Sequence, residues 1–329
     1  MRRRTFITLL GGAAVPSLLW PLAARAQSQS MPVIGYLDAG GPSVDSLHLG
    51  AFRKGLSQAG FDEGRNVAIE FRIAEQFDRL PALAQELVRL RVTVIFAASG
   101  TNVTLAAKAA TTSIPIVFQS GFDPVGLGVV SSLSRPGGNI TGVTTFTNEL
   151  NPKRLELLRE LVPQAGVIGF LGNPSEVAFA GNVSDLQAVA RRIGQQTTVL
   201  KATNAAEIDR AFASAIEQRI DALLVFPSAM LRARAQQLAE LAVKFRIPAC
   251  YATREFVTAG GLISYGDDRP ESLRQAGLYV GRILKGEKPS DLPVLQPSKF
   301  ELVINQKAAK AIGLVVPPML LARADEVIE

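Results

Sequence analysis

The sequence contains very few of the residues that metal centres and nucleophilic active sites use. Its 329 residues include one cysteine, Cys250, and one histidine, His48. A single cysteine cannot form a disulfide within the chain, and one cysteine and one histidine about 200 residues apart match no metal-ligand spacing. We therefore expect no metal site. Cys250 lies in an apolar run and is predicted to be a buried, inert thiol, and His48 is predicted to lie on a helix surface.

Motifs that bind cofactors or activate a nucleophile are also missing. There is no phosphate-binding loop, no GxGxxG that follows an expected strand and no GxSxG nucleophile elbow. No cofactor is therefore expected. Catalysis would have to rely on carboxylates or lysines, and no pair of acids stands out. These absences disfavour an enzyme.

Positive charge is concentrated at the N-terminus. The formal net charge is +6 at pH 7, and the first 26 residues hold four arginines and no acidic residue, so the rest of the chain carries +2. No basic block remains beyond this leader. The sequence therefore gives no support for nucleic acid as a partner.

Residues 1–26 have the composition of an export signal. Three arginines precede an apolar stretch over 6–24, and Ala24-Arg25-Ala26 is a cleavage site of the small-x-small type. The order Arg3-Arg4-Thr5-Phe6-Ile7 resembles a twin-arginine signal, with the general secretory route as the alternative. Glycines and prolines interrupt the apolar stretch, which barely reaches the ~20 residues that span a membrane. We expect the leader to be removed near Gln27 and the protein to reside in the periplasm.

The first part of the chain alternates strands and helices. This alternation is typical of a parallel, doubly wound sheet, in which helices connect successive strands. Helix 45–59 ends at a glycine, and helix 80–90 places leucines at helical spacing on one face. The expected strands are 33–37, 66–73, 92–98, 114–118 and 140–145.

The same pattern restarts near residue 151, so we expect an α/β protein with two lobes. About 150 residues per domain is the usual size, which agrees with two units in 329 residues. The elements after residue 259 are too few for a third domain and are expected to complete the two sheets. The chain would then cross between the lobes three times. The expected lobes are 31–146 with 259–290, and 147–258 with 291–329.

Polar side chains follow several of the expected strands. In open α/β sheets, ligands bind outside the carboxyl ends of the strands, which makes this shared position more informative than any one residue. The candidate ligand-binding residues are Tyr36, Ser99, Thr101, Asn102, Ser120, Asp123, Asn173, Ser228, Ser264 and Tyr265.

Two of these candidates suggest a ligand class. Ser99 to Asn102 open a helix, whose free N–H groups favour an anion such as a carboxylate. Asp123 offers an acceptor for an ammonium group, so the pair fits an amino acid or a similar ligand. Tyr36 is expected to stack on an apolar or aromatic part of it. The alternative for Asp123 is that it caps the short helix after Pro124.

Several motifs together resemble the substrate-binding proteins of ABC transporters, of the type labelled tryptophan/tyrosine transport substrate-binding. The resemblance covers essentially the whole chain after the leader. The motifs that carry it are Ile34-Gly35-Tyr36-Leu37, Phe52-Arg53-Lys54-Gly55-Leu56, Glu63-Gly64-Arg65-Asn66, Ile114-Pro115-Ile116-Val117-Phe118, Asp123-Pro124-Val125, Ser134-Arg135-Pro136-Gly137-Gly138-Asn139-Ile140-Thr141-Gly142, Ala259-Gly260-Gly261-Leu262-Ile263-Ser264-Tyr265-Gly266 and Phe300-Glu301-Leu302-Val303-Ile304-Asn305.

This resemblance implies a type I periplasmic-binding fold with two Rossmann-like lobes, parallel sheets and three hinge crossovers. It also implies a small ligand held between the lobes by hinge closure, and delivery of that ligand to an inner-membrane permease. Proteins of this kind usually work as monomers. Two other classes stay open: an exported domain that senses a ligand for a membrane receptor, and an exported enzyme on the same scaffold.

Overall fold

The computed structural model describes residues 31–39, 46–297 and 299–329. The export signal predicted for residues 1–26 lies outside the described residues. Within the described part, no helix combines the length and the apolar composition that crossing a membrane requires.

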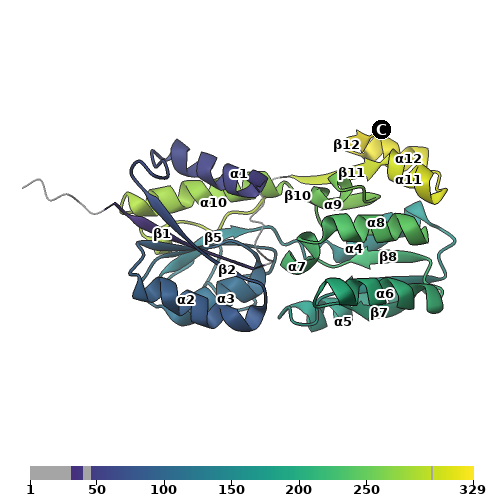
Figure 1. Cartoon of the computed structure of the whole chain (residues 1–329), viewed down its shortest axis with the longest axis horizontal. Helices are drawn as coiled ribbons and strands as arrows, with labels where there is room; N and C mark the ends of the chain where they lie inside the picture. Colours follow the sequence, from purple (N-terminus) through teal and green to yellow (C-terminus); the bar gives the residue numbers. More distant parts are fainter. Residues whose placement is uncertain (1–30, 40–45, 298) are drawn as a thin grey trace, which may run out of the picture. The chain divides into compact units, whose positions relative to one another are not determined.

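The first sheet has five parallel strands in the order β2-β1-β3-β4-β5. Figure 1 shows this sheet between two layers of helices. Its strands are β1 (Val33–Ala39), β2 (Ala68–Ala74), β3 (Val94–Ala97), β4 (Ile116–Ser120) and β5 (Ile140–Thr144). One face is covered by α2 (Leu80–Arg89), which follows the short 3₁₀ turn η1 (Phe77–Arg79), and by α3 (Gly100–Ala110). The other face is covered by α1 (Ser46–Gln58) and α10 (Arg269–Leu284). The five-stranded parallel sheet predicted from the alternating pattern is confirmed.

The second sheet has seven strands in the order β12-β11-β10-β9-β8-β6-β7. All neighbouring strands are parallel except β10 and β11, which are antiparallel. The strands are β6 (Val167–Gly172), β7 (Gln196–Lys201), β8 (Ala222–Val225), β9 (Ala249–Tyr251), β10 (Ile263–Asp267), β11 (Phe300–Asn305) and β12 (Glu326–Ile328).

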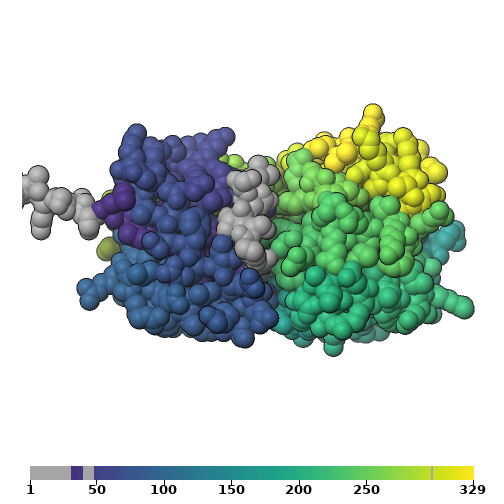
Figure 2. Space-filling view, in the orientation of Figure 1, coloured from purple at the N-terminus to yellow at the C-terminus, as the bar shows by residue number. Residues whose placement is uncertain are grey.

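Helices cover both faces of this sheet as well. One face packs against α4 (Asn151–Leu161), α5 (Phe179–Arg192), α11 (Gln306–Ile312) and α12 (Pro318–Arg323). The other packs against α6 (Ala205–Glu217), α7 (Ala229–Arg232), α8 (Ala235–Phe245) and α9 (Arg254–Thr258). In the space-filling view, the C-terminal segment with α11 and α12 is yellow and lies next to green residues, the colour that α8 and α9 have in Figure 1 (Figure 2). The predicted α/β architecture with two separate sheets is confirmed.

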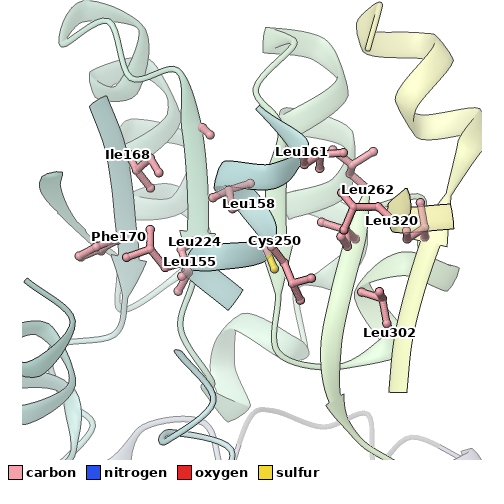
Figure 3. Close-up of a cluster of buried hydrophobic side chains, with 14 of the residues drawn as sticks. Leu155, Leu158, Leu161, Ile168, Phe170, Leu224, Cys250, Leu262, Leu302 and Leu320 are labelled. Carbon is pink, nitrogen blue, oxygen red and sulfur yellow. The ribbon is translucent and has the colours of Figure 1, made fainter. Parts of the chain in front are cut away.

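The core beneath α4 is continuous and apolar (Figure 3). Leu155 and Leu158 pack against Phe170 and Leu224 of the sheet, and all four are fully buried. Cys250 lies in the same cluster with no exposed surface, and burial raises the pKa of its thiol to about 12. The prediction of a buried, inert thiol is confirmed.

The chain passes between the two sheets three times, after β5, after β10 and after α10. The first crossing lies between β5 and α4, where the predicted boundary at 146/147 also lies, and the other two crossings fall at other residues than predicted. In segment 259–290, assigned to the first lobe, α10 packs on the first sheet but β10 pairs with β9 and β11 of the second. Segment 291–329, assigned to the second lobe, begins beside the first sheet, where the Thr144 N–H donates to the Leu295 carbonyl. In both segments the backbone hydrogen bonds determine which sheet the residues join, and the amino-acid sequence alone does not show these bonds.

Helices α1 and α10 approach each other closely because glycines lie in their contact. A Cβ atom on Gly55 would lie 1.9 Å from the Arg274 carbonyl oxygen, and one on Gly277 would lie 2.1 Å from the Phe52 carbonyl oxygen. Both obstacles are backbone atoms, which cannot rotate away. The close approach lets Phe52 and Leu56 of α1 share one buried cluster with Leu273 and Val280 of α10.

We predict that Gly55→Ala lowers the free energy of unfolding by about 1–3 kcal/mol, because the added methyl group forces the two helices apart. Gly50→Ala is the matched control in the same helix, since nothing lies within 4 Å of a Cβ atom there. It should stabilise the protein by about 0.5–1 kcal/mol through helix propensity. Urea unfolding of both variants measures the difference, and equal stabilities would contradict the close-contact account.

Candidate functional site

A cavity lies where strands of both sheets end. Its lining comes from the residues that follow β3, β4 and β5 in the first sheet and β6, β8, β9 and β10 in the second. This is the edge at which open α/β sheets place their ligands. The polar lining residues are Thr101, Gln119, Ser120, Thr145, Thr147, Asn148, Asn173, Glu176, Asn182, Ser228, Arg232, Thr253, Asp267 and Arg269.

Two arginines converge at one end of the cavity. Arg232 comes from α7 of the second sheet, and Arg269 is the first residue of α10, just after the chain leaves β10. One terminal nitrogen of each guanidinium donates a hydrogen bond to Ser99 Oγ, at 3.2 Å from Arg232 and 3.1 Å from Arg269. Burial, followed by the charge of Arg269, lowers the pKa of Arg232 to about 10, so it remains charged near neutral pH.

Three buried polar atoms at this cavity have no hydrogen-bond partner within the described part of the chain. They are the side-chain oxygens of Gln119 and Ser120 and the Nε of Arg269. Buried polar groups are nearly always paired, because an unpaired one costs about 1–3 kcal/mol. The Arg269 Nε can only donate and the Gln119 oxygen can only accept, so a molecule that satisfies both must carry an acceptor and a donor.

Two acidic side chains also line the cavity. Burial raises the pKa of Glu176 to about 7, although hydrogen bonds from Ser228 and the Ala229 N–H act in the opposite direction. Burial also raises the pKa of Asp267, which is 6% exposed and accepts a hydrogen bond from Ser272 Oγ at 3.2 Å. The charge of Arg269 opposes that shift. Both carboxyl groups are therefore placed where a positively charged ligand group would stabilise their ionised form.

The apolar part of the lining is aromatic. Phe179 and Phe226 meet edge to face with their ring centroids 6.1 Å apart, and Phe256 stacks on Tyr251 at 4.7 Å. Phe179, Phe226 and Phe256 all belong to the second-sheet side. The cavity thus combines charged and polar groups with an aromatic wall that can bury an apolar ligand part.

Side chains of the two halves also bond directly beside the cavity. The Asn102 side chain of α3 donates to the Ser175 carbonyl at 2.9 Å and accepts from the Val177 N–H at 3.1 Å. His48 Nε2 of α1 lies 2.6 Å from Glu255 Oε1 of α9. His48 is 6% exposed, so the prediction of a helix-surface histidine is wrong, and burial lowers its pKa.

The structure brings six of the ten candidate residues to the cavity or its edge. Thr101, Ser120, Asn173 and Ser228 line it, Ser99 receives both arginines, and Asn102 bonds across to the other half. The remaining four, Tyr36, Asp123, Ser264 and Tyr265, do not line this cavity. A role in ligand binding stays a prediction for all ten.

Local packing explains why those four lie elsewhere. Tyr36 is 1% exposed and its ring contacts Phe52, Phe71 and Phe96 in the core. Asp123 is exposed, and its Oδ1 accepts a hydrogen bond from the Val125 N–H at 2.9 Å, which matches the capping alternative.

Ser264 and Tyr265 lie inside β10, which extends to Asp267. The strand therefore ends two residues later than expected, and Asp267 takes the strand-end position.

Several lining residues were missed by the sequence reasoning. Asp267 and Arg269 follow from the true end of β10, so a correct strand boundary would have pointed to them. Arg232 lies one helical turn after Ser228 and could have been found by that spacing. Glu176, Asn182 and the phenylalanines have no local signal, because their positions depend on how α5, α9 and the loops after β6 and β8 pack. In the described ranges, no group of three or more His, Cys, Asp or Glu side chains is placed to hold a metal ion.

Arg154 of α4 connects the segments that frame the cavity. It has no exposed surface and donates to the Thr147 carbonyl at 2.7 Å, to Thr147 Oγ1 at 2.6 Å and to the Tyr265 carbonyl at 2.7 Å. A longer bond of 3.4 Å reaches the Ala252 carbonyl. Arg154 thereby fixes the first crossing, β10 and the end of β9. Burial lowers its pKa to about 10.

Comparison with known proteins places this architecture in a family. Residues 38–328 match the family model described as ABC transporter substrate binding protein. The chain belongs to this family.

A tyrosine-binding protein of Clostridioides difficile (strain R20291) is 30% identical to this substrate-binding protein over 274 residues, 83% of this chain and 78% of that one. The crystal structure of an ABC domain in complex with L-Trp from Streptococcus pneumonia is 25% identical with a TM-score of 0.79, covering 91% of this chain and 100% of that one. A ligand-free, open structure of a substrate-binding protein with adhesive properties from Clostridium difficile is 27% identical with a TM-score of 0.61. The match covers 91% of this chain and 99% of that one.

The buried Arg154 guanidinium is predicted to be essential for stability. Arg154→Met leaves the Thr147 and Tyr265 carbonyls without their donor, and the free energy of unfolding should fall by about 3 kcal/mol or more. Arg159→Met is the control on an exposed position of the same helix and should change it by less than about 0.5 kcal/mol. Unfolding of both variants in guanidinium chloride provides the measurement. Similar free energies of unfolding for the two variants would refute the role of Arg154.

Glu176 is predicted to make stability depend on pH. Because its pKa is raised to about 7 on folding, the folded state holds the proton more tightly, and stability is lost as the pH rises through that value. Glu176→Gln removes this loss. The unfolding free energy of the variant minus that of the wild type should grow by about 2 kcal/mol from about pH 5 to about pH 8. A difference that does not change with pH would show that Glu176 titrates normally.

Proposed function

We propose that this chain is the solute-binding component of an ABC uptake transporter, and that it captures an amino acid or a related small carboxylate in the cavity. The observation that carries the proposal is the set of unpartnered buried polar atoms that line one cavity. Water or a ligand must satisfy such atoms in a stable protein, and the gathering of several of them around one cavity favours a ligand site. Membership of a family of binding proteins argues in the same direction and against an enzyme.

The chemistry of the lining supports an amino-acid-like ligand. The arginines offer donors to a carboxylate, and Asp267 offers an acceptor to an ammonium group, the role first predicted for Asp123. Phe179 and Phe226 can enclose an apolar side chain. One relative is named for tyrosine and another was crystallised with L-Trp, which supports an aromatic amino acid as the first ligand to test.

We propose that the ligand selects a closed arrangement through movement at the three crossings. Shifting a 1:99 equilibrium to 99:1 requires about 5.5 kcal/mol of differential affinity. Hydrogen bonds to charged groups contribute ~1.5–3 kcal/mol each, so two or three contacts with Asn173, Ser228 and Arg232 of the second half, together with apolar burial, would suffice. The TM-score is higher to the L-Trp complex than to the ligand-free, open protein, 0.79 against 0.61, so this structure resembles the ligand-bound relative more than the open one.

The remaining parts of the proposal concern the cell. The protein would be exported by the signal at residues 1–26, by the twin-arginine route, and would work as a monomer in the periplasm. It would deliver its ligand to an ABC permease in the inner membrane. Family membership supports the permease as the partner.

A thermal-shift screen of the chain from Gln27 onward tests the proposal. At a ligand concentration of about 100 Kd, binding stabilises by about 2.7 kcal/mol, which corresponds to a rise in Tm of roughly 4 °C for a protein of this size. At least one of the twenty amino acids or a panel of small carboxylic acids should give such a rise, and calorimetry should find one site. A flat response to every solute at millimolar concentration would contradict the proposal.

A further inference from the structure

We infer that Arg232 and Arg269 together hold one anionic group of the ligand, a carboxylate, and that this pair makes the site select acids over their amides. The inference rests on the proposed function, because it concerns the same cavity. It assigns the ligand charge that the cavity recognises and the two side chains that recognise it.

The first argument is the arrangement of the two guanidinium groups. Both donate to the oxygen of Ser99, and Arg269 also donates to the Ala98 carbonyl at 3.4 Å, so two positive charges are brought together on neutral acceptors. In the described ranges, neither group forms an ion pair with a carboxylate, although Asp38, Glu176 and Glu255 are near enough to act on Arg232 electrostatically. Like charges at such an approach repel each other. An anion between them would remove the repulsion and gain charge-assisted hydrogen bonds.

The second argument is the unused donor capacity. A guanidinium carries five N–H bonds, and the Nε of Arg269 is buried with no partner among the described residues. The N–H groups at the start of α3, a helix of 11 residues, face the same end of the cavity, since Gly100 and Thr101 belong to the lining. Ser120, 2% exposed and also unpartnered, lines the cavity with them. Planar guanidinium groups match the two oxygens of a carboxylate.

The third argument is the position of the two arginines in the chain. Arg232 belongs to the second half, and Arg269 lies at the crossing that leads back to the first. Ser99, their shared acceptor, belongs to the first half. A carboxylate at this point therefore contacts the elements on both sides of the cavity. An amide in its place carries no charge and presents an N–H₂ group toward a guanidinium donor, which leaves a clash of donors.

Calorimetry with matched acid and amide pairs tests the inference. The probes are L-tryptophan, L-tyrosine, L-leucine and 3-phenylpropanoic acid, each with its primary amide. For the acid that binds most tightly, the amide should bind at least 100-fold more weakly to the wild type. Arg232→Met and Arg269→Met should each weaken the acid at least tenfold and the amide less than threefold. Arg232→Lys keeps the charge but loses the planar guanidinium group. Its affinity for the acid should lie between those of the wild type and Arg232→Met.

Arg234→Met is the control, because Arg234 is exposed two residues from Arg232, and its affinities should match the wild type. The variants are compared only after thermal unfolding shows that they fold. Equal affinity of acid and amide, or Met variants that bind the acid as the wild type does, would overturn the inference and leave the proposed function intact. Binding of uncharged solutes with no binding of any acid would also overturn the inference and leave the proposed binding function intact. Failure of every solute, charged or uncharged, would overturn both.

Discussion

The buried guanidinium of Arg154 is the interaction on which the cavity depends. One fully buried side chain bonds to the first crossing and also to β10 and the end of β9, which lie about 100 positions further along the chain. Thr147 and Ala252, which it contacts, are themselves lining residues. A guanidinium suits this place because its donors are fixed in one plane and remain charged when buried. The Arg154 side chain therefore holds the backbone segments that carry the polar lining residues in place.

The charged side chains of the cavity have few hydrogen-bond partners within the protein. Arg232 and Arg269 share one hydroxyl, and Glu176 and Asp267 have pKa values raised by burial. These groups are positioned without being neutralised by each other, which is costly in an empty protein and useful for recognising a charged solute. The aromatic residues of the opposite wall add apolar area. The site is thus prepared for a molecule with a charged end and an apolar part.

The sequence predicted the architecture well because the alternation of strands and helices is a local signal. It also predicted which edge of the sheets carries polar groups, and Thr101, Ser120, Asn173 and Ser228 do lie there. It failed where tertiary packing decides. Tyr36 turns into an aromatic core, and β10 joins the second sheet and runs on to Asp267. The arginine pair could not be read from the sequence, because its members are 37 positions apart and meet only through Ser99.

The central claim is that one small solute is held in the cavity by groups from both halves of the protein. A crystal structure of the protein with the solute that stabilises it most tests this claim directly. The account predicts a single bound molecule in contact with Gln119 or Ser120 on the first side and with Arg232 or Ser228 on the second. Electron density for the solute outside the cavity, or contacts confined to one side, would contradict it.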